Sequence, residues 1–303
     1  MVAVPESTWS LTTSTEPAAR DAAQLCATAV HLAGLAAAHV RARRPEVFGP
    51  GASADSAVRT KSTPTDPVTI VDTETEQVIR DELARLRPDD RVLGEEGGGD
   101  LAGADSGEVV WVVDPIDGTV NFLYGIPAYS VSVAAVRGGR PVAGAVADIA
   151  ASALYAAAAG HGATRTGPDG VPEQLRCTPV GSARMALVAT GFGYGVARRT
   201  QQARVVAELL PHIRDIRRIG SAALDLCMVA EGRVDAHYEH GLNPWDWAAG
   251  ALIAAEAGAV LRLPPLATTG AEGALVVAAA PGISTELLEL FDRLGVSAPL
   301  PEP

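Results

Sequence analysis

Hydrophobic residues recur with different periods along the chain, and the changes of period predict its elements. Between residues 15 and 44, Ala, Leu and Val follow helical spacing, so we expect one long helix. Residues 45–65 are rich in Gly, Ser and Pro and predict a mobile loop, and a second helix is expected at about Thr73–Arg87. Short runs rich in apolar and β-branched residues then predict strands at 91–93, 109–113, 129–136, 142–147 and 153–158, with a hairpin over 163–177.

Beyond residue 180 the pattern alternates between strands and helices. Strands are expected at 185–190, 215–218, 234–238, 259–263 and 274–280, and helices at 199–210, 221–231, 244–257 and 283–294. The first half therefore combines helices with an antiparallel meander, and the second half is α/β. We expect a flexible tail over 1–14, an α+β half over 15–180 and an α/β half over 181–303, joined in one compact unit.

Composition narrows the classes of function. The 303 residues, 48% of them hydrophobic, are enough for a large core, and a net charge of −12 argues against a nucleic-acid partner, which requires a basic patch. The first residues lack a basic segment followed by an apolar one, and no apolar run suggests a membrane span. Cysteines without C-x-x-C spacing (Cys26, Cys177 and Cys227) suit a reducing compartment, so a cytoplasmic location is expected.

The candidate chemistry centres on the segment Trp-Val-Val-Asp-Pro-Ile-Asp-Gly-Thr-Val-Asn-Phe at 111–122. Asp114 and Asp117 follow the expected strand at 109–113, with a proline stiffening the turn between them. Gly118 permits close approach of the backbone to a ligand, and Thr119 adds a hydroxyl beside backbone amides. Carboxylates crowded at a strand end suit a hard cation such as Mg²⁺, and the amides suit a phosphate. A turn capped by aspartates would explain the hexapeptide alone.

Further acids lie at similar positions. Glu95 follows the strand at 91–93 in a Gly-Glu-Glu-Gly turn, Asp246 begins the helix at 244–257, and Asp72 lies at the start of the second helix. A solvated turn or a helix cap would account for each of them separately. Taken together, acids gathered in one site would repel one another and require cations to neutralise them.

Other motifs are weaker. The Gly-Phe-Gly-Tyr-Gly segment at 191–195 has its third glycine one place too early for a dinucleotide loop, so we interpret it as a turn. His237 and His240 lie three residues apart without a nearby cysteine, and no H-x-x-x-H is present, which argues against zinc. No G-x-S-x-G elbow supports a serine hydrolase.

From about Ala18 to Leu294 the chain resembles the inositol monophosphatase family, and most of all its bacterial SuhB-type members. The resemblance rests on six motifs in order: Lys61-Ser62 followed by Asp66-Pro67-Val68-Thr69 and Asp72; Gly94-Glu95-Glu96; the stretch from Asp114 to Phe122; Arg218-Ile219-Gly220-Ser221-Ala222-Ala223; Tyr238-Glu239; and Trp245-Asp246 with Glu256-Ala257-Gly258. Any one of them could arise by chance, but six in order could not.

The resemblance implies a layered αβαβα sandwich that is usually a homodimer, depends on Mg²⁺ and is inhibited by Li⁺. It implies two or three Mg²⁺ ions per site, held by Glu95, Asp114, the Ile116 carbonyl, Asp117 and Asp246. Asp72 and Thr119 would activate the attacking water, with Glu95 also reaching a third ion. Substrate contacts are implied for Glu95, Asp117, Gly118, Thr119, Gly220, Ser221, Ala222, Glu239 and Asp246, for Lys61 on a mobile loop, and for Arg217, which is the weaker candidate and could instead lie at a subunit interface.

The implied reaction is hydrolysis of myo-inositol 1-phosphate, a small phosphorylated polyol. The same carboxylates would serve a phosphatase of histidinol phosphate, fructose 1,6-bisphosphate or 3'-phosphoadenosine nucleotides. A protein-binding regulatory role on the transcription machinery is an alternative of a different class. Residues 240–244 precede Trp245 and vary among such enzymes, so the sequence leaves the substrate open.

Overall fold

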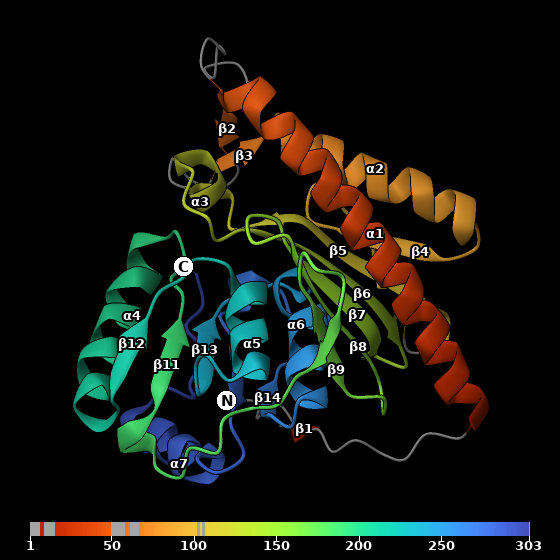
Figure 1. Cartoon of the computed structure of the whole chain (residues 1–303). Helices are drawn as coiled ribbons and strands as arrows, with labels where there is room; N and C mark the ends of the chain where they lie inside the picture. The colour runs from red at the N-terminus through yellow and green to blue at the C-terminus, as the bar shows by residue number, and fades with distance from the viewer. Residues whose placement is uncertain are drawn as a thin grey trace.

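The computed structural model describes residues 7–8, 16–49, 58–60, 67–101, 104 and 107–302. Its elements stack in five layers, α, β, α, β and α (Figure 1), which confirms the predicted sandwich. The first layer is α1 (Glu16–Phe48) and α2 (Ile70–Leu86), and the middle layer is α5 (Ala222–Glu231) and α6 (Pro244–Glu256). The last layer contains α4 (Val196–Leu209) and α7 (Ser284–Leu294).

A seven-stranded sheet lies between the first and middle layers. Its strand order is β10-β9-β8-β7-β6-β5-β4, and every neighbouring pair is antiparallel except β4 and β5. The strands are β4 (Arg91–Gly94), β5 (Val110–Asp117), β6 (Ser130–Arg137), β7 (Arg140–Asp148), β8 (Ala153–Ala158), β9 (Ala163–Thr166) and β10 (Pro172–Gln174). Helices cover both of its faces, so Val110–Val113 are all fully buried and form a continuous apolar run.

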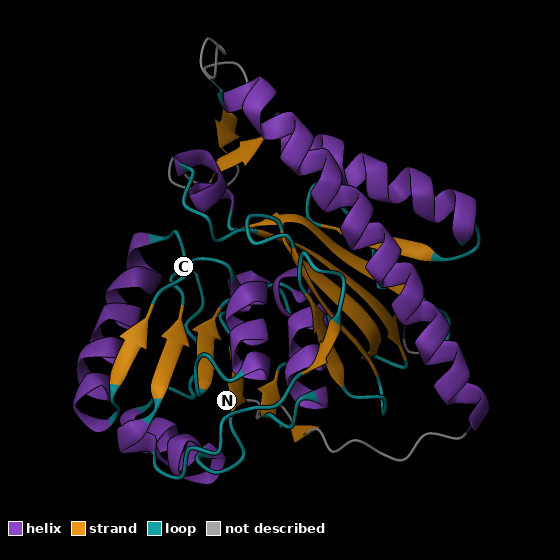
Figure 2. Cartoon of the chain, in the orientation of Figure 1, coloured by secondary structure: helices purple, strands orange, loops and turns teal. Residues whose placement is uncertain are grey.

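The second large sheet has six strands in the order β1-β14-β15-β13-β11-β12 (Figure 2). Strand β11, next to the edge strand β12, is parallel to both neighbours, whereas β15 runs antiparallel to β13 and β14. The strands are β1 (Ser7–Thr8), β11 (Leu187–Thr190), β12 (Asp215–Arg217), β13 (Ala236–His240), β14 (Val260–Leu263) and β15 (Leu275–Ala279); a separate pair is formed by β2 (Val58–Thr60) and β3 (Pro67–Thr69).

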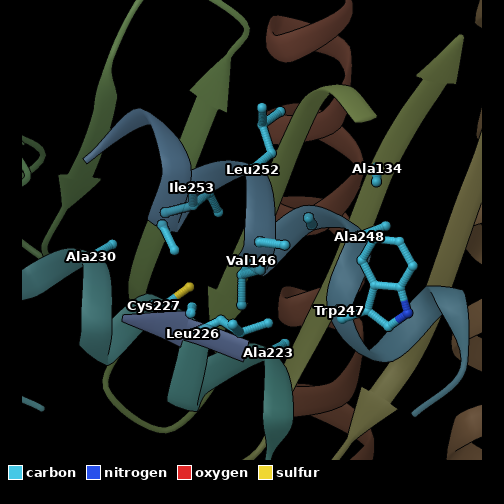
Figure 3. Close-up of a cluster of buried hydrophobic side chains, with 14 of the residues drawn as sticks. Ala134, Val146, Ala223, Leu226, Cys227, Ala230, Trp247, Ala248, Leu252 and Ile253 are labelled. Atoms are coloured by element: carbon cyan, nitrogen blue, oxygen red, sulfur yellow. The ribbon is translucent and has the colours of Figure 1, made fainter. Parts of the chain in front are cut away.

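The helices of the middle layer carry the main core between the two sheets. Trp247 and Leu252 of α6 pack with Leu226 of α5 and with Val146 of the seven-stranded sheet (Figure 3). Two further cores lie outside the sheets, one under α1 and α2 and the other under α7. The middle helices are therefore apolar around most of their surface.

Helix α1 differs from the prediction at its end. It was expected to stop at Arg44 before Pro45, but it continues to Phe48, through the start of the expected loop. A proline removes one helical hydrogen bond, but packing stabilises this last turn: Phe48 meets Phe122 edge-on at 5.5 Å, and Arg44 donates to the Phe122 carbonyl. Among the described helices α1 is also the one long and apolar enough to cross a membrane, yet its apolar side is buried against the sheet.

Four other features depart from the sequence-based expectation. Ser7–Thr8, within the expected tail, forms the edge strand β1, which pairs with β14, and β2 lies in the expected loop. Strand β5 extends beyond residue 113 to Asp117. A short helix, α3 (Thr119–Tyr124), was not expected; it follows Gly118, whose φ of +93° is accessible to glycine at little cost.

Candidate active site

A bulge at the end of β5 brings the two central aspartates to one place. Asp114 pairs with Ser132 and Asp117 with Ser130, so three steps on β5 face two on β6. Residues three apart on a regular strand point to opposite faces, and the extra residue of a bulge corrects this. Pro115, which cannot donate to a ladder, lies within the bulge. Asp114 Oδ1 accepts a hydrogen bond from the Ile116 amide at 3.0 Å.

Asp72 and Thr119 form a buried pair beside the bulge. Asp72 is the third residue of α2, where its Oδ2 closes a capping box with Thr69, accepting from the Thr69 amide at 3.0 Å and from the Thr69 hydroxyl. Its other oxygen, Oδ1, lies 3.1 Å from Thr119 Oγ1, which also lies 3.0 Å from the Ile116 carbonyl oxygen. The Thr119 hydroxyl thus has two acceptors. Asp72 is both a helix cap and a part of the site.

The turn that carries Glu95 is fixed by a residue that the sequence analysis did not identify. Glu76 of α2 is buried, and its carboxylate accepts from the amides of Glu96 at 2.7 Å and Gly97 at 2.8 Å. Arg80 donates to the same carboxylate at 2.7 Å. A Cβ on Gly97 would lie 2.6 Å from the Glu76 carboxylate, which explains the glycine that follows the two glutamates.

Asp117 is held by the first turn of α5. Its Oδ2 accepts from the Ser221 hydroxyl at 2.5 Å and from the Ala223 amide at 2.8 Å. The Ser221 hydroxyl lies 3.1 Å from that of Ser130, and the side-chain amide of Asn121 donates to the Ile219 carbonyl at 2.9 Å. These contacts bind the loop before α5 to the end of β5, although about one hundred residues separate them in the chain.

Asp246 is positioned by the start of α6. It is the third residue of that helix, and its Oδ2 accepts from the Asn243 amide at 2.7 Å in a second capping box. Ser132 on β6 donates to the carbonyl of the preceding Trp245 at 3.0 Å. The two capping boxes therefore place Asp72 and Asp246 at helix N-termini that converge on the bulge.

A cavity of about 620 Å³ opens at this convergence. It is lined by Glu95, Asp114, Ile116, Asp117, Gly118, Thr119, Gly220, Ser221, Ala222, Glu239 and Asp246 from the expected set. Asp72 adjoins it through Thr119. Arg217 is not part of the lining; it is exposed and pairs with Asp215 at 2.7 Å. Lys61 falls outside the described residues.

The structure adds residues to the lining that the sequence analysis had not assigned. Arg218, next to Arg217, lies in the cavity wall, and so does the segment 191–195, interpreted from the sequence only as a turn. Arg198 is 3% exposed and reaches the wall from α4, where it donates to the carbonyl of Leu300 at 2.6 Å. Gly191, the first glycine of Gly-Phe-Gly-Tyr-Gly, was the sign in the sequence that this segment lies at the cavity, because only glycine at this position leaves room for the Glu239 carboxylate.

The acids of the cavity are electrostatically unfavourable without cations. Burial raises the pKa of Asp117 to about 6, and the negative charge of Glu95 adds to the effect. Burial, followed by the charges of Glu95 and Asp117, raises the pKa of Asp246 well above its usual value. Burial also raises the pKa of Asp72 to about 7 and that of Glu239 to about 8. Each carboxylate makes it harder for the next to ionise.

This donor set fits divalent cations. Six carboxylates line the cavity (Glu95, Asp114, Asp117, Glu239, Asp246 and Glu302), against the two guanidinium groups of Arg198 and Arg218. Arg198 is already paired with Glu302 at 3.3 Å. Hard oxygen donors at high density and a deficit of positive charge are the conditions under which proteins bind Mg²⁺. The cluster of Glu95, Asp114, Asp117 and Asp246 is therefore a candidate metal centre.

Fold and site together define a layered α/β protein with a cavity built from carboxylates and suited to divalent cations. Comparison with known proteins agrees, because the model of the inositol monophosphatase family matches residues 21–294. The chain belongs to the inositol monophosphatase family.

Its relatives are similar over most of their length. The inositol-1-monophosphatase SuhB of Mycobacterium tuberculosis is 59% identical over 285 residues, which is 92% of this chain and 97% of the relative. The solved structure of Mycobacterium tuberculosis SuhB matches with a TM-score of 0.75 and 54% identity, covering 90% of this chain and 97% of that one. The Nus factor SuhB of Vibrio cholerae is 34% identical over 81% of this chain and 90% of its own.

Proposed function

We propose that this phosphatase is Mg²⁺-dependent and hydrolyses the phosphate monoester of a small polyol, with myo-inositol 1-phosphate as the preferred substrate. The observation that carries the proposal is the convergence of Glu95, Asp114, Asp117 and Asp246 on one cavity beside the Asp72–Thr119 pair. The 59% identical relative named inositol-1-monophosphatase supports the choice of substrate.

The cavity divides into a phosphate end and an alcohol end. At the phosphate end, two or three Mg²⁺ ions would be held by Glu95, Asp114, Asp117, Asp246 and the Ile116 carbonyl; bound there, they would neutralise phosphoryl charge and make water a stronger nucleophile. The amides of Gly118 and Thr119, both in the lining, are the candidate donors to the phosphate oxygens.

The chain's own contribution to the hydrolytic step is to orient one water and to take its proton. Thr119 Oγ1 donates towards Asp72 or Ile116, so its lone pairs are free to accept a hydrogen bond from a water in the cavity. A proton released by that water passes through the Thr119 hydroxyl to Asp72 Oδ1. A carboxyl whose pKa lies near 7 can take up and release a proton at neutral pH.

At the alcohol end, Glu239, the Ala222 amide and Asp117 would bind the hydroxyl groups of the polyol, with Gly220 and Ser221 forming the adjacent wall. Arg218, rather than Arg217, lines the cavity together with Arg198. Residues 240–243 continue the lining towards Trp245, so this part of the wall would discriminate among polyols. We further propose a cytoplasmic homodimer.

The test is phosphate release from myo-inositol 1-phosphate, histidinol phosphate, fructose 1,6-bisphosphate and 3'-phosphoadenosine 5'-phosphate, each with Mg²⁺, with Mg²⁺ plus Li⁺, and with a chelator. The proposal expects Mg²⁺-dependent, Li⁺-sensitive turnover that is fastest with myo-inositol 1-phosphate. Faster turnover of another ester under the same metal profile would change the substrate and keep the mechanism. No release from any ester would contradict the proposal.

A second candidate is a regulatory role through protein contacts. The observation that favours it is the relative named Nus factor SuhB, which is 34% identical over most of both chains. Retention of RNA polymerase by the immobilised protein would support this role, and equal retention by the Asp114→Asn variant would show that it does not depend on the metal centre.

A further inference from the structure

Behind the alcohol end of the cavity lies a buried row of three ionisable side chains. His237 and Glu239 are two residues apart on β13 and so point to the same face of the strand, towards Asp225 on α5. The side chains of His237 and Asp225 are 0% and 1% exposed. His237 Nδ1 lies 3.7 Å from Asp225 Oδ2, and His237 Nε2 lies 3.9 Å from Glu239 Oε2.

Within the described part of the chain these groups lack the hydrogen bonds that buried polar atoms require. Both ring nitrogens of His237 and Asp225 Oδ1 are buried without a hydrogen-bond partner, and each such atom carries a desolvation cost. Each ring nitrogen faces a different carboxylate. A metal ion would bind only one nitrogen of the ring, whereas a chain of hydrogen bonds uses both. If each carboxylate moved about 1 Å closer to the ring nitrogen that it faces, both contacts would become normal hydrogen bonds.

The electrostatics of the three side chains favour one arrangement of protons, in which Asp225 donates to His237 and His237 donates to Glu239. Burial lowers the pKa of His237 to about 3, so the ring is neutral at pH 7 and carries a single N–H. Burial, and then the charges of Glu239 and Asp117, raise the pKa of Asp225 well above its usual value, so Asp225 retains its proton. Burial raises the pKa of Glu239 to about 8 although the charge of Arg218 opposes the shift, so Glu239 is largely protonated at pH 7 and accepts through its carbonyl oxygen. Asp225 then donates to Nδ1, and Nε2–H donates to Glu239.

We propose that Asp225 and His237 are positioning residues, which act through a hydrogen-bond chain to hold the Glu239 carboxylate against the alcohol end of the cavity. Gly191 confines the same carboxylate from the neighbouring strand, since a Cβ there would lie 2.1 Å from Glu239 Oε2. Glu239 is thus fixed between β11 and His237. The inference rests on the proposed function, because it takes the Glu239 end of the cavity to bind the hydroxyl groups of the substrate.

The kinetic test compares a hydroxyl-rich ester with one that has no hydroxyl groups. His237→Phe fills the ring volume but cannot donate to Glu239. We expect kcat/KM for myo-inositol 1-phosphate, relative to phenyl phosphate, to fall about tenfold, mainly through KM, as for the loss of one hydrogen bond that leaves its buried acceptor unsatisfied. His237→Gln restores one donor, so its ratio of the two kcat/KM values should return most of the way to the wild-type ratio. Cys227→Ala is the matched control, because Cys227 is equally buried on α5 and only packs in the core.

The second readout is the tautomer of His237 and does not depend on turnover. Long-range ¹H–¹⁵N spectra of the histidine-labelled protein, assigned with His237→Gln, should show a neutral ring with its proton on Nε2 at pH 7. Asp225→Asn keeps a donor towards Nδ1, so the same tautomer should persist. If the enzyme hydrolyses no ester, the proposed function fails, and the spectrum alone decides whether the hydrogen-bond chain exists.

Three results would overturn the inference. One is a His237→Phe variant whose kcat/KM for myo-inositol 1-phosphate, relative to phenyl phosphate, stays within twofold of that of the Cys227→Ala control. Another is a His237 ring that is charged at pH 7 or carries its proton on Nδ1. The third is a zinc ion that co-purifies with the protein and is lost in His237→Gln, which would make the row a metal site.

Discussion

Asp72 should make the metal-free protein less stable as the pH rises, and Asp72→Asn should remove this dependence. Burial raises the pKa of Asp72 from 3.8 to about 7 in the folded chain. A carboxyl whose pKa is raised by folding contributes full stability only below about pH 4, its unfolded pKa, and that contribution is lost as the pH rises through 7. Between pH 5 and pH 8 this loss is about 2.5 kcal/mol, which for a chain of this length lowers Tm by about 4 °C.

Asparagine suits the position because its carbonyl can accept from Thr69, and its amide can donate to the Thr119 hydroxyl, which still reaches the Ile116 carbonyl. Any loss of unfolding free energy in Asp72→Asn that does not depend on pH lowers Tm equally at both pH values. The assay is thermal unfolding in chelator, followed by circular dichroism at pH 5 and pH 8. Asp81→Asn, on the exposed side of the same helix, should follow the wild type.

The quantity to compare is the fall in Tm from pH 5 to pH 8. The wild type should fall about 4 °C further than Asp72→Asn. If the two proteins fall by the same amount to within about 1 °C, Asp72 does not ionise over this range, and the role of its carboxylate as proton acceptor at neutral pH is refuted.

Three other predictions follow from the site. Asp114→Asn should lose more than nine-tenths of kcat, a barrier increase above about 1.4 kcal/mol, because the Asp114 carboxylate is central to the proposed binding of cations by the cluster. A variant that retains more than one-tenth of kcat in a phosphate-release assay would contradict the metal centre. Gly191→Ala should raise KM for the polyol ester with little change in Tm, since its Cβ displaces the Glu239 carboxylate; an unchanged KM would exclude Glu239 from substrate binding. Arg198→Met should destabilise the fold by about 3 kcal/mol in urea titrations, because it leaves the carbonyls of Gly270, Ala271 and Leu300 without their buried donor; a loss below about 1 kcal/mol would show that water replaces it.

The pattern of the sequence predicted the core elements well because most of them are either buried on both faces or amphipathic. The antiparallel meander and the helices of the second half lie within a few residues of their expected positions. The failures are at places where tertiary contacts override local rules. Pro45 predicted the end of a helix, but contacts of Phe48 and Arg44 with Phe122 stabilise one more turn. The spacing of hydrophobic residues near Pro45 cannot reveal that Arg44 will contact Phe122, which lies 78 residues away in the chain.

The same limit applies to the site. The acids at strand ends and helix starts could be identified because glycine and proline mark those positions. The groups that orient them could not, because Glu76 lies in the middle of a helix, and Asp225 and His237 occupy ordinary helix and strand positions. Arg218 also appeared only as part of a motif, whereas its neighbour Arg217 points into solvent. The sequence pattern alone cannot tell which of two adjacent residues at a strand end faces the cavity and which faces solvent.

The balance of charge in the cavity sets the order of binding. Arg198 is engaged by three carbonyl oxygens and by Glu302, so it offers little positive charge to a ligand. Arg218 is then the remaining guanidinium among the lining residues, opposite five carboxylates. Their raised pKa values keep Glu239 and Asp246 largely protonated at neutral pH, but the other carboxylates would still repel a phosphate that entered this cavity alone. Under the proposed Mg²⁺ dependence, cations would bind before the phosphate, and the helix starts that hold Asp117 and Asp246 would keep the cluster assembled until they do. Phosphate affinity should consequently rise with Mg²⁺ concentration, and the hydrogen bonds from the starts of α5 and α6 hold the Asp117 and Asp246 carboxylates close to each other.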